Sequence, residues 1–213
     1  MITHQDDQPV SRTLSIAVSG FSLTGLPFFL LAALIFFLTM TLSSLLVQAK
    51  EQEVTFDKIE PIFEANCVSC HSGMFARQGY DLSSHEGAVS PRGRVRVVPG
   101  NPDSSELVRR VRGQARPSMP LNQLLLSPED IELIERWVAG GARDAQGRAV
   151  TMPAGASVRL HGYLTDRWEL DGLPLVVTRG TRIDDSPETG EYVQVRGHLD
   201  REGRVVAERI RPR

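Results

Sequence analysis

Cys67-Val68-Ser69-Cys70-His71 is the most informative stretch of this 213-residue sequence. Two cysteines separated by two residues and followed directly by a histidine form a C-x-x-C-H motif, the attachment signature of c-type haem. The two thiols add to the vinyl groups of the porphyrin, and the adjacent imidazole binds the iron as its proximal ligand. Because Cys67 and Cys70 are the only cysteines in the chain, the motif predicts one covalent haem c.

Two other uses of a C-x-x-C pair fit this sequence less well. A thioredoxin-like redox pair occurs near a βαβ pattern, and no such pattern surrounds Cys67. A structural zinc site needs further ligands at zinc-finger spacing, and the sequence has no second cysteine pair. The haem interpretation is therefore favoured.

The N-terminal region contains an uncharged apolar run over residues 26–47, LPFFLLAALIFFLTMTLSSLLV. As a helix this run could cross a hydrocarbon core of about 30 Å. Val47-Gln48-Ala49 places small residues where a signal peptidase would cleave after Ala49. The run is longer than the usual signal-peptide core of about 7–15 residues, which favours a retained anchor.

Under both interpretations of this run, the remainder of the chain is expected to lie outside the cytoplasm. The preceding segment carries Arg12 but also Asp6 and Asp7, so the positive-inside bias is weak. We expect a transmembrane helix over 26–47 and a single-pass protein of the cell membrane. Its later domains would lie in the periplasm or another extracytoplasmic space.

Composition excludes few functions. Apolar residues make up 41% of the chain and charged residues 23%, as in ordinary globular proteins. The net charge of −2 and the absence of a basic stripe give no reason to expect a nucleic-acid partner.

Residues 51–145 are expected to form a small all-α haem domain. Apolar residues at helical spacing predict a helix from Thr55 to Asn66, with Pro61 causing either a kink or a later start near Glu60. Residues 72–103 contain many glycines and prolines and are expected to be irregular and to wrap the haem. A third segment is predicted to be helical between Ser104 and Gly113.

The last helix of this domain has the clearest start. Ser127-Pro128-Glu129-Asp130 combines an N-cap residue, a proline in the first turn and two acidic residues near the positive helix end. Gly140-Gly141 is expected to end it. Trp137 should lie where this helix packs against the Thr55–Asn66 helix.

Met119 is the first candidate for the sixth iron ligand. It lies between prolines in Arg116-Pro117-Ser118-Met119-Pro120, where a thioether is poorly placed for core filling. A thioether at the sixth position raises the haem potential; the alternative is that Met119 simply packs on the porphyrin. His85 could serve instead, although a surface histidine is the simpler interpretation. Met74 follows His71 too closely to reach the opposite face.

Arg109, Arg110 and Arg112 project away from the apolar side of the middle helix. They form either a solvated face or a partner for a haem propionate.

Residues 55–143 resemble the planctomycete-type cytochrome c domains, within the class I cytochrome c group. The resemblance is carried by the C-x-x-C-H motif, by Gly79-Tyr80-Asp81-Leu82-Ser83, by Pro99-Gly100-Asn101-Pro102, by Met119-Pro120 and by the stretch from Ile134 to Ala142. It implies a haem pocket of three to four helices, with His71 proximal and Met119 distal. The iron ligands would thus be His71 and Met119, and the haem-binding residues Cys67, Cys70, His71 and Met119.

Residues 157–213 are expected to form a small β-domain after a linker over 146–156. Alternating apolar residues separated by turn signals such as Asp171-Gly172 and Thr189-Gly190 predict five or six short strands. We expect these strands to close into an OB-like barrel, with His161 and His198 exposed on its polar face. The segment resembles a family of small exported bacterial β-domains of unassigned function, through residues such as Gly162, the stretch 181–183 and the stretch 193–197.

The sequence as a whole predicts a multi-domain protein: a tail and anchor over 1–50, a haem domain over 51–145, a linker, and a β-barrel. The expected function is that of a membrane-tethered monohaem cytochrome c. It would exchange electrons with a redox partner protein or membrane complex, as a possible subunit of a respiratory or photosynthetic assembly. Catalysis by this chain alone is not expected, because two protein ligands leave the iron no site for substrate. A haem-based sensor and a structural subunit are the alternatives.

Overall fold

A computed structural model describes residues 32–33, 35–38, 53–90, 93–121, 124–152 and 154–213. The chain divides into two compact units, residues 1–51 and residues 52–213. The fold described below is that of the second unit, which contains both the helices and the sheet. We call residues 53–145 the helical domain and residues 157–213 the β-domain.

The transmembrane helix expected over residues 26–47 is a prediction that needs correction. Most of that range lies outside the described residues, and the described part, 32–33 and 35–38, is short and helical. A membrane-spanning helix needs about 20 apolar residues. Among the residues that the structure describes, no helix has the length and apolarity to cross a membrane. The single-pass location that was inferred from such a helix is withdrawn with it.

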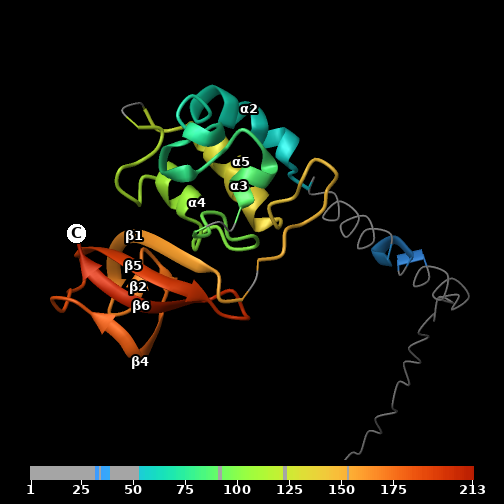
Figure 1. The fold of residues 1–213 in the computed structure, drawn as a ribbon. Coiled ribbons are helices and arrows are strands. Elements are labelled where there is room, and N and C mark those ends of the chain that lie inside the picture. The colour runs from blue at the N-terminus through green and yellow to red at the C-terminus, as the bar shows by residue number, and fades with distance from the viewer. Residues whose placement is uncertain (1–31, 34, 39–52, 91–92, 122–123, 153) are drawn as a thin grey trace, which may run out of the picture. The chain divides into compact units, whose positions relative to one another are not determined.

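The helical domain consists of short helices joined by irregular segments (Figure 1). In chain order they are α2 Phe56–Asn66, the 3-10 turns η1 Gly73–Phe75 and η2 Arg77–Gly79, α3 His85–Val89, α4 Glu106–Val111 and α5 Pro128–Ala139. Helix α2 begins directly after Thr55 and includes Pro61, so the later start near Glu60 is wrong. Helix α5 begins as predicted: the Ser127 hydroxyl accepts a hydrogen bond of 3.1 Å from the Asp130 backbone N–H.

Trp137 lies at the centre of the helical core. Its side chain is fully buried, and its ring centroid lies 6.1 Å from that of Phe56 and 6.2 Å from that of Phe63. The indole N–H donates a 2.9 Å hydrogen bond to the Arg143 carbonyl. Helices α2 and α5 therefore pack through aromatic rings, as their apolar faces predicted.

The expectation of an all-α haem domain needs correction. The described helices are short, and the segment around Val95 leaves the helical core to form a parallel bridge with Val158 of the β-domain. The Val95 N–H donates a 2.8 Å hydrogen bond to the Ser157 carbonyl. In this extended segment Val97 belongs to the helical core, whereas Val95 and Val98 belong to the core of the sheet.

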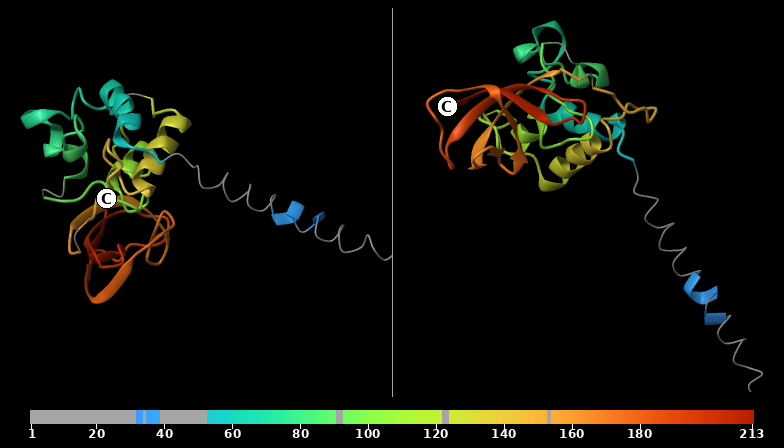
Figure 2. Two further views of the ribbon diagram at one scale, coloured as in Figure 1. Left: turned by 90° about the vertical axis from the view of Figure 1, so that its right-hand side faces the viewer. Right: turned by 90° about the horizontal axis from the view of Figure 1, so that it is seen from below.

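The β-domain is one six-stranded sheet in the order β3-β2-β1-β5-β6-β4. The strands are β1 Ser157–Asp166, β2 Glu169–Leu170, β3 Leu173–Pro174, β4 Val176–Ile183, β5 Tyr192–Leu199 and β6 Val205–Pro212. All neighbours are antiparallel except β4 and β6, which are parallel. The sheet curls into a half-barrel (Figure 2). The closed barrel is therefore a second wrong prediction: β3 and β4 remain at opposite edges of the described sheet, and β2 and β3 are too short to extend it.

A β-bulge changes which side chains of β6 face the core. The register between β5 and β6 shifts between Arg196 and Gly197, so that Glu208 has no opposing residue. Val205 and Ala207 are buried before the shift, and Ile210 is buried after it. Strict alternation along a strand would place Ile210 on the opposite face from Val205, and the bulge returns it to the core side.

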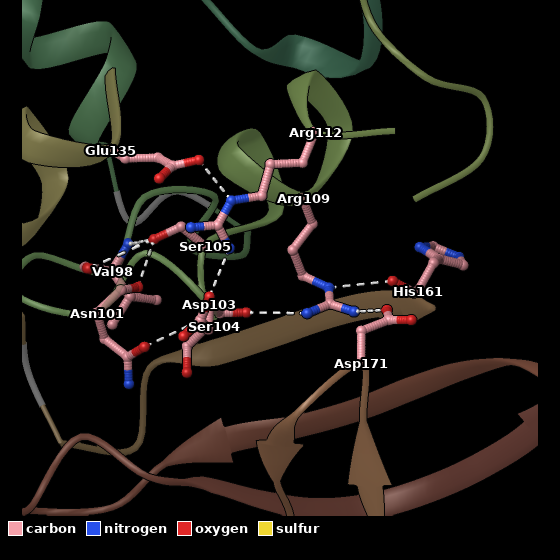
Figure 3. A network of polar contacts seen from close by, with 10 residues as sticks. All are labelled: Val98, Asn101, Asp103, Ser104, Ser105, Arg109, Arg112, Glu135, His161 and Asp171. Atoms are coloured by element: carbon pink, nitrogen blue, oxygen red, sulfur yellow. Dashed lines mark hydrogen bonds and ion pairs between the residues drawn. The ribbon is translucent and has the colours of Figure 1, made fainter. Parts of the chain in front are cut away.

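A buried arginine joins the two domains (Figure 3). Arg109 of α4 is 0% exposed and forms an ion pair with Asp171 at the turn between β2 and β3. Its other guanidinium N–H groups donate to the His161 carbonyl at 3.1 Å and to the Asp103 carbonyl at 3.2 Å. Gly162 of β1 makes room for the pair, because a Cβ atom there would overlap both the Asp171 carboxylate and the Arg109 guanidinium.

Replacing Trp137 by alanine should lower the free energy of unfolding by about 3–5 kcal/mol, because it leaves a large cavity in the helical core. Urea unfolding of the full chain followed by circular dichroism measures the change. Leu124→Ala is the control, since Leu124 is 92% exposed and its truncation should cost less than about 0.5 kcal/mol. Equal effects of the two substitutions would contradict this account of the core.

Gly162→Ala should destabilise the chain by about 1–3 kcal/mol, the usual cost of forcing extra volume into a packed site. Gly180→Ala on β4 is the matched control, because the nearest atom to its added Cβ would be the Thr178 hydroxyl at an ordinary 3.6 Å. The same unfolding experiment compares them. A Gly162→Ala chain as stable as the control would mean that the Arg109–Asp171 pair does not need this space.

Candidate functional site

A cavity of about 690 Å³ lies where the C-x-x-C-H motif meets the β-domain. The motif residues Cys67, Cys70 and His71 line it, as does Met119 from the loop between α4 and α5. Its apolar lining comes from Leu82, Leu107, Val111, Pro117, Pro120 and Leu121. The structure thus brings the four sequence-predicted site residues to one cavity.

Helix α2 and the turn after it place the motif on the cavity wall. The Cys67 N–H still donates to the Phe63 carbonyl at 2.8 Å, and the Cys70 and His71 N–H groups both donate to the Cys67 carbonyl, at 3.1 and 3.0 Å. This tight turn keeps the two thiols and the imidazole on the same side of the chain. Both cysteines are free thiols, and burial raises the pKa of Cys67 to about 11. A thiol of this kind is protonated at neutral pH, unlike the low-pKa thiolate of a redox pair.

The surroundings of His71 leave one of its ring nitrogens free to bind a metal. Its Nδ1 lies 3.1 Å from the Tyr80 carbonyl oxygen. A carbonyl can only accept, so Nδ1 carries the proton and Nε2 keeps its lone pair. Burial lowers the pKa of His71, which favours the neutral ligand form. Tyr80 is itself fixed, because its hydroxyl donates to the Ala88 carbonyl at 3.2 Å.

The loop that carries Met119 is tied to the end of α4. The Met119 N–H donates to the Arg110 carbonyl at 3.1 Å, and the Arg110 guanidinium donates to the Pro117 carbonyl at 2.6 Å. Arg110 also pairs with Glu106 at 3.0 Å. The backbone at Pro117 and Met119 is therefore tied to Arg110 by two hydrogen bonds, and the Met119 side chain lines the cavity.

The other candidates for the sixth ligand lie elsewhere. His85 does not line the cavity; its Nε2 lies 2.7 Å from the Ala142 carbonyl oxygen, and its ring packs against Phe56 and Trp137. Met74 is 89% exposed. Met119 is the candidate whose position the structure favours.

Arginines dominate the polar part of the cavity wall. Six arginines and one carboxylate, Glu106, are among its described lining residues; the arginines are Arg77, Arg94, Arg96, Arg110, Arg159 and Arg213. Two buried N–H donors, Arg94 Nη1 and Arg159 Nε, have no partner among the described residues. Buried donors without acceptors are rare and call for an explanation.

A haem fits these observations. Its ring would meet the apolar lining, and its propionates would supply the carboxylate oxygens that the unpartnered Arg94 and Arg159 donors lack. Of the three arginines considered from sequence, only Arg110 lines the cavity. Arg109 is paired with Asp171, and Arg112 is paired with Asp103 at 2.5 Å and Glu135 at 2.6 Å.

The β-domain contributes Arg159, His161, Gln194 and Arg213 to the cavity, and sequence reasoning missed all four. The alternation along β1 did place Arg159 and His161 on the polar face, but that face was expected to meet solvent. His161 is partly buried instead, and its burial together with nearby arginines lowers its pKa to about 4.

His161 is a neutral hydrogen-bond donor toward this cavity. The Gln194 carbonyl oxygen accepts from Arg196 and Arg211, each at 3.1 Å, so the Gln194 amide nitrogen faces the histidine. That nitrogen lies 2.7 Å from His161 Nε2, and because it can only donate, Nε2 accepts and Nδ1 bears the proton. His161 Nδ1 is buried and has no partner in the part of the chain that the structure describes, which makes it a third unpartnered donor.

Comparison with family models supports the same division of the chain. A model described as Planctomycete cytochrome C matches residues 67–120. This match runs from the first motif cysteine to the proline after Met119. A model described as Domain of unknown function (DUF5666) matches residues 157–211, all but the last residues of the β-domain. The two resemblances seen in the sequence are thus confirmed over these ranges, and the first supports a haem c cofactor. Searches of curated proteins and of solved structures found no match.

Arg159→Gln should lower the reduction potential of the haem-loaded protein by roughly tens of millivolts. Loss of a nearby positive charge favours the ferric state, which carries one more positive charge. Arg201→Gln is the control, because Arg201 is exposed on the turn between β5 and β6 and the net charge changes equally. Spectroelectrochemical titration measures both. Equal potentials in the two variants would place Arg159 away from the haem.

Proposed function

We propose that this chain is a monohaem cytochrome c that carries single electrons to or from a redox partner protein. The observation that carries the proposal is the convergence of Cys67, Cys70, His71 and Met119 on one cavity. When bound there, a haem would supply an iron that alternates between the ferrous and ferric states. The chain contains two cysteines, enough to attach one haem through two thioether bonds.

The roles of the residues follow from their surroundings. Cys67 and Cys70 hold the porphyrin covalently, and His71 binds the iron through Nε2 because its Nδ1 is engaged by the Tyr80 carbonyl. Met119, which lines the same cavity, would supply the sixth ligand. The arginines would neutralise the propionates, and neutral His161 would donate a hydrogen bond to them; the positive charges would favour the ferrous state and raise the potential.

An iron bound on both sides by the protein has no site for a substrate, so we propose an electron carrier rather than an enzyme. Exposed apolar side chains near the predicted ligands in sequence support contact with a protein partner. Met74 and Phe75, just after the motif, are 89% and 90% exposed, and Leu124, which follows the Met119 loop, is 92% exposed.

Optical spectra of the protein matured with haem test the proposal. We expect haem that resists acid–acetone extraction, low-spin bands in both oxidation states, and the weak red charge-transfer band of methionine–iron ligation in the ferric state. Met119→Ala should abolish that band and let carbon monoxide bind the ferrous protein at once. Met74→Ala should behave as wild type, because Met74 lies on the surface and not in the cavity.

Immediate binding of carbon monoxide to the wild-type ferrous protein would contradict a methionine-ligated carrier. It would favour the haem-based sensor, which requires an open sixth position. Absence of any covalent haem after maturation would overturn both functions.

A further inference from the structure

The β-domain contacts the loop that carries Met119 at Arg116. Arg116 lies three residues before Met119, and its guanidinium carbon lies 5.4 Å from the ring centroid of Tyr163 and 5.0 Å from that of Tyr192. The guanidinium donates to the Tyr163 hydroxyl, and the Arg116 backbone N–H donates to the Tyr192 hydroxyl.

The two tyrosines contact each other across neighbouring strands. Tyr163 of β1 and Tyr192 of β5 are directly opposite in the antiparallel register. Their ring centroids lie 5.1 Å apart at an angle of 65°, an edge-to-face arrangement that stabilises both rings. Tyr192 also stacks on His161, with 6.5 Å between centroids and 18° between planes. The ring that binds Arg116 therefore also packs against a side chain of the cavity wall.

The loop is fixed by the β-domain at its beginning as well. Arg109, whose carbonyl accepts a 3.0 Å hydrogen bond from the Ala115 N–H, is the residue that forms the buried ion pair with Asp171. Arg109 and Arg116 thus connect the start of the loop to the β-domain through two independent contacts. Between Arg116 and Met119 lie only Pro117 and Ser118, and proline restricts the backbone there.

We propose that the β-domain, matched by a family of unknown function, acts as a clamp that holds the Met119 loop in position to ligate the iron. This inference rests on the proposed function. Arg116, Tyr163 and Tyr192 are positioning residues: they act on the iron only through Met119. Loss of the clamp leaves the haem attached through Cys67 and Cys70 but makes the methionine easier to displace.

Competition with imidazole on the ferric haem-loaded protein tests the clamp. Imidazole binds by displacing the methionine, and the loss of the charge-transfer band reports it. Arg116→Gln removes the guanidinium hydrogen bond to Tyr163 and the cation–π contacts, whereas the double variant Tyr163→Phe with Tyr192→Phe removes both hydroxyl acceptors. Each should raise the affinity for imidazole about three- to tenfold. Combining all three substitutions should raise it by less than the product of the two effects, because both variants remove the hydrogen bond between the Arg116 guanidinium and Tyr163.

Arg167→Gln is the matched control. Arg167 makes a cation–π contact within the β-domain, with its guanidinium carbon 5.7 Å from the Trp168 ring centroid, and Trp168 packs against the core of the sheet. The control should leave the imidazole affinity unchanged. Unchanged affinity in the Arg116 and tyrosine variants, with haem attached and the band present, would overturn the clamp and leave the electron-carrier function intact. A wild-type protein without the band would overturn the methionine ligation on which both rest.

Discussion

The buried ion pair between Arg109 and Asp171 is the interaction on which the rest of the structure depends. Burial lowers the pKa of Arg109, and the nearby Asp171 carboxylate opposes that shift. A buried charged group is tolerated only when its hydrogen-bonding groups have partners. The carbonyls of Asp103 and His161 accept hydrogen bonds from the N–H groups of Arg109 that do not bind Asp171. Removing one partner of a buried pair costs about 3–5 kcal/mol, whereas forming the pair gains far less net stability. It fixes α4 on β1, and the cavity forms beside that contact.

Because α4 and β1 are fixed together, one cavity receives side chains from both domains. The helical domain provides the thiols, the proximal imidazole and the thioether, whereas the β-domain provides Arg159, His161, Gln194 and Arg213. The concentration of unpartnered donors there would be unfavourable in an empty protein and becomes favourable when an anionic group accepts their hydrogen bonds. The propionates of a haem bound there would explain the polarity of the wall, and the same positive charges would favour the reduced iron.

Short-range residue patterns in the sequence predicted the parts of the fold that depend on contacts between residues close together in the chain. The motif and the cap at Ser127 depend on neighbours within one or two turns of helix, and the contact between α2 and α5 at Trp137 was indicated by the apolar face of each helix. Other features that depend on distant contacts were missed or wrong. The bulge at Glu208 and the half-barrel come from pairings between strands, and His161 was expected to be exposed because nothing near it in sequence indicates that α4 covers its face. Met119 was proposed from its flanking prolines, whereas Tyr163 and Tyr192, which contact its loop through Arg116, belong to another domain and leave no local signal.

Paramagnetic nuclear magnetic resonance can measure whether both domains border one haem. Backbone amide shifts of the haem-loaded protein would be compared between the diamagnetic ferrous and the paramagnetic ferric states. If both domains border the haem, we expect large shifts at Arg159, His161 and Gln194, comparable to those near Met119, and small shifts along β4, which does not line the cavity. Shifts confined to the helical domain, with β1 and β5 unaffected, would contradict it.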